Sequence, residues 1–120
     1  MRRTRRNRIG LHRGDVARGL DDSRRAISTL EPLIARQPDR ATMTSLAMSY
    51  DSLADALEHR RDYREALVYR KKEANLFERL AAANPKDLNV QRNLALGYKY
   101  LGGILEAVGD VAQATPTTTS

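Results

Sequence analysis

The sequence predicts an all-α fold built from antiparallel helical hairpins, and three observations lead to that class. The helix-forming residues Ala, Leu, Arg and Glu dominate the middle of the chain. No segment alternates Val, Ile or Thr with polar residues as a strand would. An Asp preceded by Gly or Arg recurs at separations of 47 and 48 residues, as Gly14-Asp15, Arg61-Asp62 and Gly109-Asp110. A repeat of this length indicates one supersecondary unit that has been copied.

The first helix is expected from about Asp15 to Arg36. Pro32 lies inside this range and should kink or divide the helix, because proline removes a backbone donor and clashes with the preceding turn. Gln37-Pro38 then ends it. The candidate buried residues are Val16, Leu20, Ala26, Ile27, Leu30, Leu33 and Ile34.

The second helix is expected to follow Asp39, which is placed as its N-cap, and to end near Arg60. Its apolar residues follow the three-and-four spacing of an amphipathic helix, which predicts that they are buried. They are Leu46, Tyr50, Leu53, Ala54 and Leu57.

The third helix should begin at Asp62, since Glu65 three residues later completes a start signal resembling a capping box. Asn84-Pro85 should end it. Its inward residues are expected to be Tyr63, Ala66, Leu67, Arg70, Ala74, Phe77 and Leu80.

The fourth helix should begin near Asp87 and end before Gly109-Asp110, after which a further short helix is expected to run to Ala114. Its apolar stripe is Val90, Leu94, Tyr98, Leu101, Ile104, Leu105 and Val108. The chain then divides into a basic arm (1–13), a helical repeat domain (14–114) and a threonine-rich tail (115–120). Both ends are expected to be disordered, because neither has the apolar residues that a core needs.

The basic arm accounts for the whole net charge of +6. It holds six of the 21 basic residues and no acid, whereas the rest of the chain is neutral. A block of like charges is typical of a solvated tail, but it also favours phosphate or an acidic partner. The candidate contacts are Arg2, Arg3, Arg5, Arg6 and Arg8. Nucleic acid, acidic protein and lipid headgroups all remain open as partners of this arm.

Composition argues against several function classes. The chain has no cysteine, which excludes disulfides and thiolate chemistry. It has no apolar run of the roughly 20 residues that a membrane span needs, and no secretory signal, so we expect a cytoplasmic protein that does not bind membranes. His12 and His59 are interpreted as surface residues, because neither has the partners that a general base or a metal site requires. We therefore expect no catalytic residues, no cofactor and no metal.

Two of the repeated units, aligned on Asp62 and Asp110, resemble tetratricopeptide repeats (TPR), whose pattern combines large residues, small residues and a Gly-Asp-Tyr turn. The second unit reads Tyr50, Leu53-Ala54, Ala56-Leu57, Asp62-Tyr63 and Ala66. The third reads Tyr98, Leu101-Gly102, Ile104-Leu105, Gly109-Asp110-Val111 and Ala114. The resemblance covers residues 15–114 and implies a short TPR-like α-solenoid that serves as a protein-binding scaffold.

The chain departs from this family in two ways. Its period exceeds the usual length of about 34 residues, and Arg61 replaces the usual glycine. The long second helices, with ends such as residues 78–85, resemble bacterial arrays attached to serine/threonine protein kinases. No kinase motif is present in the sequence. A repeat-bearing piece of such a multidomain regulator, and a nucleic-acid-associated protein that uses the arginine arm, are the alternatives to a stand-alone interaction module.

The resemblance also implies where a peptide would bind, since the concave surface of the family comes from the first helix of each pair. The matching residues are Asp51, Asp55, Glu58, Lys99, Gly103 and Glu106. Three carboxylates on one helix face favour a basic peptide, and the alternative is a solvated helix face. The first unit lacks most of its opening helix and the last unit lacks most of its closing helix. Exposed faces at both ends therefore predict self-association or docking onto neighbouring repeats.

Overall fold

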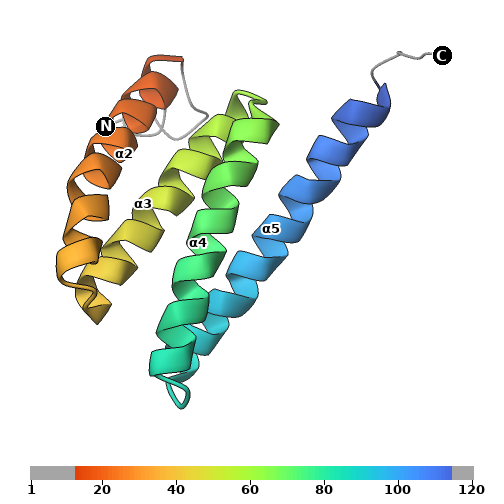
Figure 1. Cartoon of the computed structure of the whole chain (residues 1–120). Coiled ribbons are helices and arrows are strands. Elements are labelled where there is room, and N and C mark those ends of the chain that lie inside the picture. Colours follow the sequence, from red (N-terminus) through yellow and green to blue (C-terminus); the bar gives the residue numbers. More distant parts are fainter. Residues whose placement is uncertain (1–12, 115–120) are drawn as a thin grey trace, which may run out of the picture.

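The computed structural model describes the backbone of residues 13–114 and the side chains of residues 17–110. This part of the chain is all-helical and contains no strand (Figure 1). Its helices are α2 (Arg13–Arg36), α3 (Arg40–His59), α4 (Tyr63–Ala83) and α5 (Leu88–Ala114). The predicted all-α class is therefore confirmed for the described residues. The basic arm and the threonine-rich tail lie outside them.

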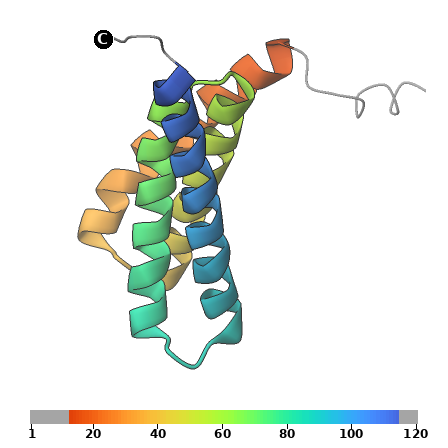
Figure 2. The same cartoon turned by 90° about the vertical axis from the view of Figure 1, so that its right-hand side faces the viewer.

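The helices lie side by side in the order of the sequence, and consecutive helices run in opposite directions (Figures 1 and 2). α2 packs against α3, α3 against α4, and α4 against α5. Within residues 13–114 no other pair of helices packs closely backbone to backbone. Each helix therefore depends on its neighbours in sequence for burial of its apolar face.

The starts of α3 and α5 are capped in the same way, at positions 48 residues apart. The carboxylate of Asp39 accepts a hydrogen bond from the Thr42 backbone N–H at 2.8 Å, as predicted for an N-cap. The carboxylate of Asp87 accepts from the N–H groups of Asn89 and Val90 at 2.9 and 3.2 Å. Such caps satisfy backbone donors that the first helical turn leaves unpaired.

A second contact repeats along the chain. The hydroxyl of Tyr50 on α3 donates a hydrogen bond to Glu31 on α2 at 2.6 Å. The hydroxyl of Tyr98 on α5 donates in the same way to Glu78 on α4. The acids are 47 residues apart and the tyrosines 48, so the α4–α5 interface reproduces the α2–α3 interface.

The expected end of the first helix at Arg36 and the expected start of the third at Asp62 are both observed, but two details differ. α2 is not divided at Pro32 but continues to Arg36. Pro32 is exposed, so water can bond the carbonyl whose helical partner is missing. Asp62 does precede α4, but its side chain makes no capping hydrogen bond, and its carboxylate lies 3.5 Å from the Arg60 guanidinium instead.

The repeated Arg/Gly-Asp step adopts two conformations: at Arg61-Asp62 it ends α3, whereas at Gly109-Asp110 it remains helical. Arg61 adopts a left-handed conformation with φ of 66°. The Arg61 N–H donates to the Glu58 carbonyl and the Asp62 N–H to the Leu57 carbonyl, both at 2.9 Å, which is the Schellman ending of a helix. Gly109 has no positive φ, and α5 runs through Gly109-Asp110 to Ala114. The prediction of a separate short helix after Gly109-Asp110 is therefore wrong, because these residues belong to α5.

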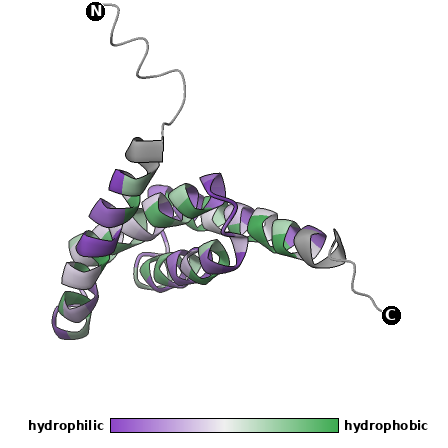
Figure 3. Cartoon of the chain, turned by 90° about the horizontal axis from the view of Figure 1, so that it is seen from above, coloured by the Kyte–Doolittle hydropathy of each residue, from purple (hydrophilic) through white to green (hydrophobic). Residues whose placement is uncertain are grey.

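The core lies where α3 and α4 meet, and all five predicted apolar residues of α3 are buried. Leu53 and Leu57 are the largest fully buried side chains. On α5 the prediction holds for Val90 and Ile104, whereas Tyr98 and Leu105 are 46% and 48% exposed. Apolar residues nevertheless occur along the length of α5 (Figure 3). Tyr98 and Leu105 are exposed because, within the described residues, α5 packs against α4 alone.

Candidate functional site

Arg70 on α4 is the centre of a buried ionic cluster, and only 4% of this charged residue is exposed. Its Nε donates to the Glu58 carboxylate at 2.8 Å. Its Nη1 donates to Asp51 at 2.6 Å and to Glu73 at 3.1 Å. Its guanidinium also lies over the ring of Tyr100, 4.9 Å from the centroid. One side chain thus ties α4 to both α3 and α5.

The cluster holds three carboxylates around one guanidinium, so it cannot be neutral when all groups are ionised. Burial, and then the nearby charge of Asp51, raise the pKa of Glu73 to about 7. Burial lowers the pKa of Arg70, but hydrogen bonds to Asp51 and Glu58 outweigh it, and the net pKa lies above its usual value. Arg70 therefore stays charged and Glu73 binds a proton near neutral pH.

The predicted peptide-binding residues fall into two groups. Asp51 and Glu58 are half-buried and bound to Arg70. Asp55 is exposed, and the nearest base in the described structure is His59, at 3.8 Å. On α5 the residues are exposed, and within the described range Lys99 and Glu106 form no ion pair. The five candidate arginines of the arm lie outside the described residues.

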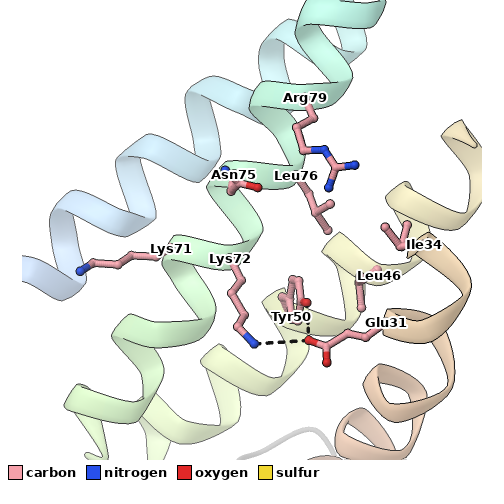
Figure 4. A pocket seen from close by; sticks show the side chains of 9 residues that line it. All are labelled: Glu31, Ile34, Leu46, Tyr50, Lys71, Lys72, Asn75, Leu76 and Arg79. Carbon is pink, nitrogen blue, oxygen red and sulfur yellow. Dashed lines mark hydrogen bonds and ion pairs between the residues drawn. The ribbon is translucent and has the colours of Figure 1, made fainter. Parts of the chain in front are cut away.

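A groove of about 350 Å³ lies on α2, α3 and α4 (Figure 4). Its apolar lining consists of Ile34, Leu46, Tyr50 and Leu76. Its polar lining consists of Glu31, Lys71, Lys72, Asn75 and Arg79. A volume near the lower end of the range for ligand pockets suits a few side chains of a partner segment.

One edge of the groove is closed by a bridge between α2 and α4. The Glu31 carboxylate accepts hydrogen bonds from the Tyr50 hydroxyl at 2.6 Å and from the Lys72 ammonium at 3.3 Å. The Lys72 ammonium also lies 5.7 and 5.5 Å from the ring centroids of Tyr50 and Tyr69. Burial, followed by the bond to Glu31, raises the pKa of Tyr50 above its usual range, so the hydroxyl remains a donor.

The charge that remains available in the groove is that of Arg79. Its guanidinium lies at the edge above Leu76, whereas Lys71 points away from the groove (Figure 4). Among the described residues Arg79 has no hydrogen-bonded or ion-paired acid. The negative charge of Glu31 is already matched by Lys72. Considering the described residues alone, the groove presents an apolar surface beside the unmatched positive charge of Arg79.

Sequence reasoning missed the groove and the Arg70 cluster. Glu31 and Glu78 carried a usable signal, because each lies 19 or 20 residues before a tyrosine in two units of the repeat. Arg70 carried another, since it was the charged member of an otherwise apolar inward stripe. A charge at such a position predicts buried acids opposite it.

Among the described helices none is long and apolar enough to cross a membrane. Searches against family models, curated proteins and solved structures found no match to this chain.

Proposed function

We propose that this chain is a non-catalytic protein-interaction module, a TPR-like helical array that binds a segment of a partner protein. The observation that carries the proposal is the groove on α2, α3 and α4, with an apolar lining and an unmatched Arg79. The repeated Tyr–Glu contacts support the array, because they show one helix pairing used twice. An array of this kind offers elongated surfaces rather than an enclosed site.

The lining determines the chemistry of the partner segment. Ile34, Leu46 and Leu76 favour a large apolar side chain, because burying it removes apolar surface from water. Arg79 favours a carboxylate close to that side chain, since guanidinium and carboxylate form charge-assisted hydrogen bonds. The partner segment is therefore apolar and acidic.

The predicted acidic face of α3 supports a basic peptide less strongly than this groove supports an acidic one. Asp51 and Glu58 already bind Arg70, and displacing them would leave a buried guanidinium short of partners. Asp55 on α3 and Glu106 on α5 remain accessible to a basic segment. The two partner classes differ in charge, so one titration separates them.

The test uses two fluorescent peptides with identical leucine positions, one with Glu at the polar positions and the other with Lys. Fluorescence anisotropy should show tighter binding of the Glu peptide. Arg79→Glu should weaken that binding about tenfold, a loss of about 1.4 kcal/mol. Arg64→Glu is the matched control, because it makes the same charge change at an exposed residue that does not line the groove.

Equal loss in the two variants would show that the peptide responds to net charge and not to the groove. Tighter binding of the Lys peptide would contradict binding in the groove and would indicate that the partner binds the acidic face of α3. Absence of binding by both peptides at millimolar concentration would contradict the proposal.

A further inference from the structure

α5 occupies the same position in the array as α3, one repeat later. The Tyr98–Glu78 bond corresponds to the Tyr50–Glu31 bond, and the Asp87 cap corresponds to the Asp39 cap. By the same correspondence α4 repeats α2 with an offset of 47 residues. This equivalence makes it possible to compare how each copy is covered.

α3 carries a seam of alternating small and large residues that α4 covers. The seam consists of Ala47, Tyr50, Ala54 and Leu57, spaced by three or four residues, and none is more than 5% exposed. α4 contributes directly to this cover, because the Tyr69 ring lies 5.9 Å from the Tyr50 ring. A seam with this spacing is the usual contact surface between two antiparallel helices.

The same seam is uncovered on α5. Its members, 48 residues after those of α3, are Ala95, Tyr98, Gly102 and Leu105, and all of them are exposed. Tyr98 is 46% exposed where Tyr50 is 5%, and Leu105 is 48% exposed where Leu57 is 1%. A Cβ at Gly102 would meet nothing within 4 Å. No helix in the described part of the chain takes the role of α4 here.

α2 also has a face that is less buried than the equivalent face of α4. On α4 the residues Ala66, Glu73 and Leu80 are buried. The equivalent residues of α2, 47 positions earlier, are Gly19, Ala26 and Leu33, and they are only partly buried. A Cβ at Gly19 would meet nothing within 4 Å. α2 therefore presents an α4-like face with no α3-like helix against it in the described structure.

We infer that a second copy of this chain docks head to tail, so that its α2 covers the α5 seam as α4 covers α3. The existing interface sets the register. Lys72 lies over Tyr50 and pairs with Glu31. Arg25 is the α2 equivalent of Lys72, so Arg25 of the second copy would lie over Tyr98 and pair with Glu78. Arg25 is free to do so, since its side chain is 76% exposed and pairs only with Asp21 among the described residues.

The seam, rather than charge, would hold this interface. The Arg24–Glu65 pair between α2 and α4 has Lys71 and Arg18 as its counterparts across the two copies, which are like charges. One favourable and one unfavourable exposed pair nearly cancel. Burial of Tyr98 and Leu105 then supplies the stabilisation, and added salt should change the affinity little.

A head-to-tail contact uses different surfaces on the two copies, so it does not close into a dimer. Sedimentation velocity over a concentration series should show species that keep growing beyond two copies. Leu105→Glu blocks the α5 face by placing a charge in the seam, and it should weaken self-association at least about tenfold. Arg25→Glu blocks the α2 face because it makes both cross-copy pairs like-charged, and it should weaken self-association about fivefold. Val68→Glu is the matched control, since Val68 is 47% exposed on α4 and should leave assembly unchanged.

The decisive measurement mixes the two blocked variants. Leu105→Glu keeps an intact α2 face and Arg25→Glu keeps an intact α5 face, so an equimolar mixture should form a dimer of one copy of each and stop there. A symmetric α5–α5 dimer would instead be insensitive to Arg25→Glu and would overturn the inference, as would a monomer at every concentration. Peptide binding to the groove reports separately on the proposed function, because neither Leu105 nor Arg25 lines it.

Discussion

Replacing Arg61 by glycine is expected to stabilise the protein. Arg61 has a φ of 66°, and a left-handed conformation costs a residue with a Cβ about 1–2 kcal/mol. Glycine avoids that cost, but it adds about 0.4–1 kcal/mol of conformational entropy to the unfolded chain. The net gain is about 0.5–1 kcal/mol. The hydrogen bonds that end α3 involve only backbone atoms at this residue, so the substitution preserves them.

Arg60→Gly provides the matched control. Arg60 is the adjacent residue, has the same side chain and is exposed, but its φ of −87° is ordinary. Glycine there should destabilise the protein by about 0.5–1 kcal/mol. The exposed Arg60–Asp62 pair that is lost should contribute little. The two neighbouring substitutions are therefore expected to have opposite signs.

The assay is thermal unfolding followed by circular dichroism at one low protein concentration, which limits any contribution from association. A gain of about 0.5–1 kcal/mol corresponds to a rise in Tm of roughly 2–4 °C for a domain of this size. Urea unfolding should give the same sign with an unchanged slope. An Arg61→Gly variant no more stable than Arg60→Gly would refute the argument from backbone conformation.

Two further predictions concern titratable groups. The pKa of Glu73 is about 7 in the folded protein, above its usual value, so its contribution to stability is present below about pH 4.5 and lost as pH rises through 7. Glu73→Gln should therefore be more stable than the wild type at pH 8, with a difference that shrinks at pH 5, and Glu65→Gln serves as an exposed control for urea unfolding at both values. Asp39→Ala should destabilise the protein at pH 7, because it removes the N-cap hydrogen bond to the Thr42 N–H. The Thr42 hydrogen bond lowers the pKa of Asp39, so the stability gained from the ionised carboxylate is lost as pH falls through that lowered pKa. The difference between the two proteins should therefore shrink in acid, which acid titration of both will test.

The helix boundaries that could be predicted are those set by local chemistry. Pro38, Asp39 and Pro85 act on their own neighbours in sequence, so their effects need no knowledge of packing. The left-handed turn at Arg61 was predictable only by alignment, because the residue itself disfavours it. The continuation of α5 past Gly109 was not predictable. Glycine permits a helix to end there but does not require it, so the motif alone does not decide between ending and continuing.

The sites were harder to predict than the helices, because they depend on residues from three elements. The spacing of Asp51, Asp55 and Glu58 correctly places them along one helix, but it contains no information about Arg70, 12 residues beyond Glu58. A buried guanidinium then converts two of the three carboxylates from a candidate binding surface into an internal contact. An acidic binding surface and an internal ionic cluster can have the same spacing of carboxylates in the sequence. What distinguishes them is whether a basic residue such as Arg70 is buried against those carboxylates.

The exposed seam of α5 shows what the repeat adds to that reasoning. Taken alone, Tyr98 and Leu105 are two exposed apolar residues, which are common on protein surfaces. Their equivalents in α3 are buried by a helix whose own equivalent is α2. The packing of α4 on α3 thus indicates both which kind of helix would cover α5 and in which register it would lie. If the mixture of blocked variants forms a dimer, the same 47- and 48-residue offset that relates two hairpins within one chain will also relate hairpins between chains.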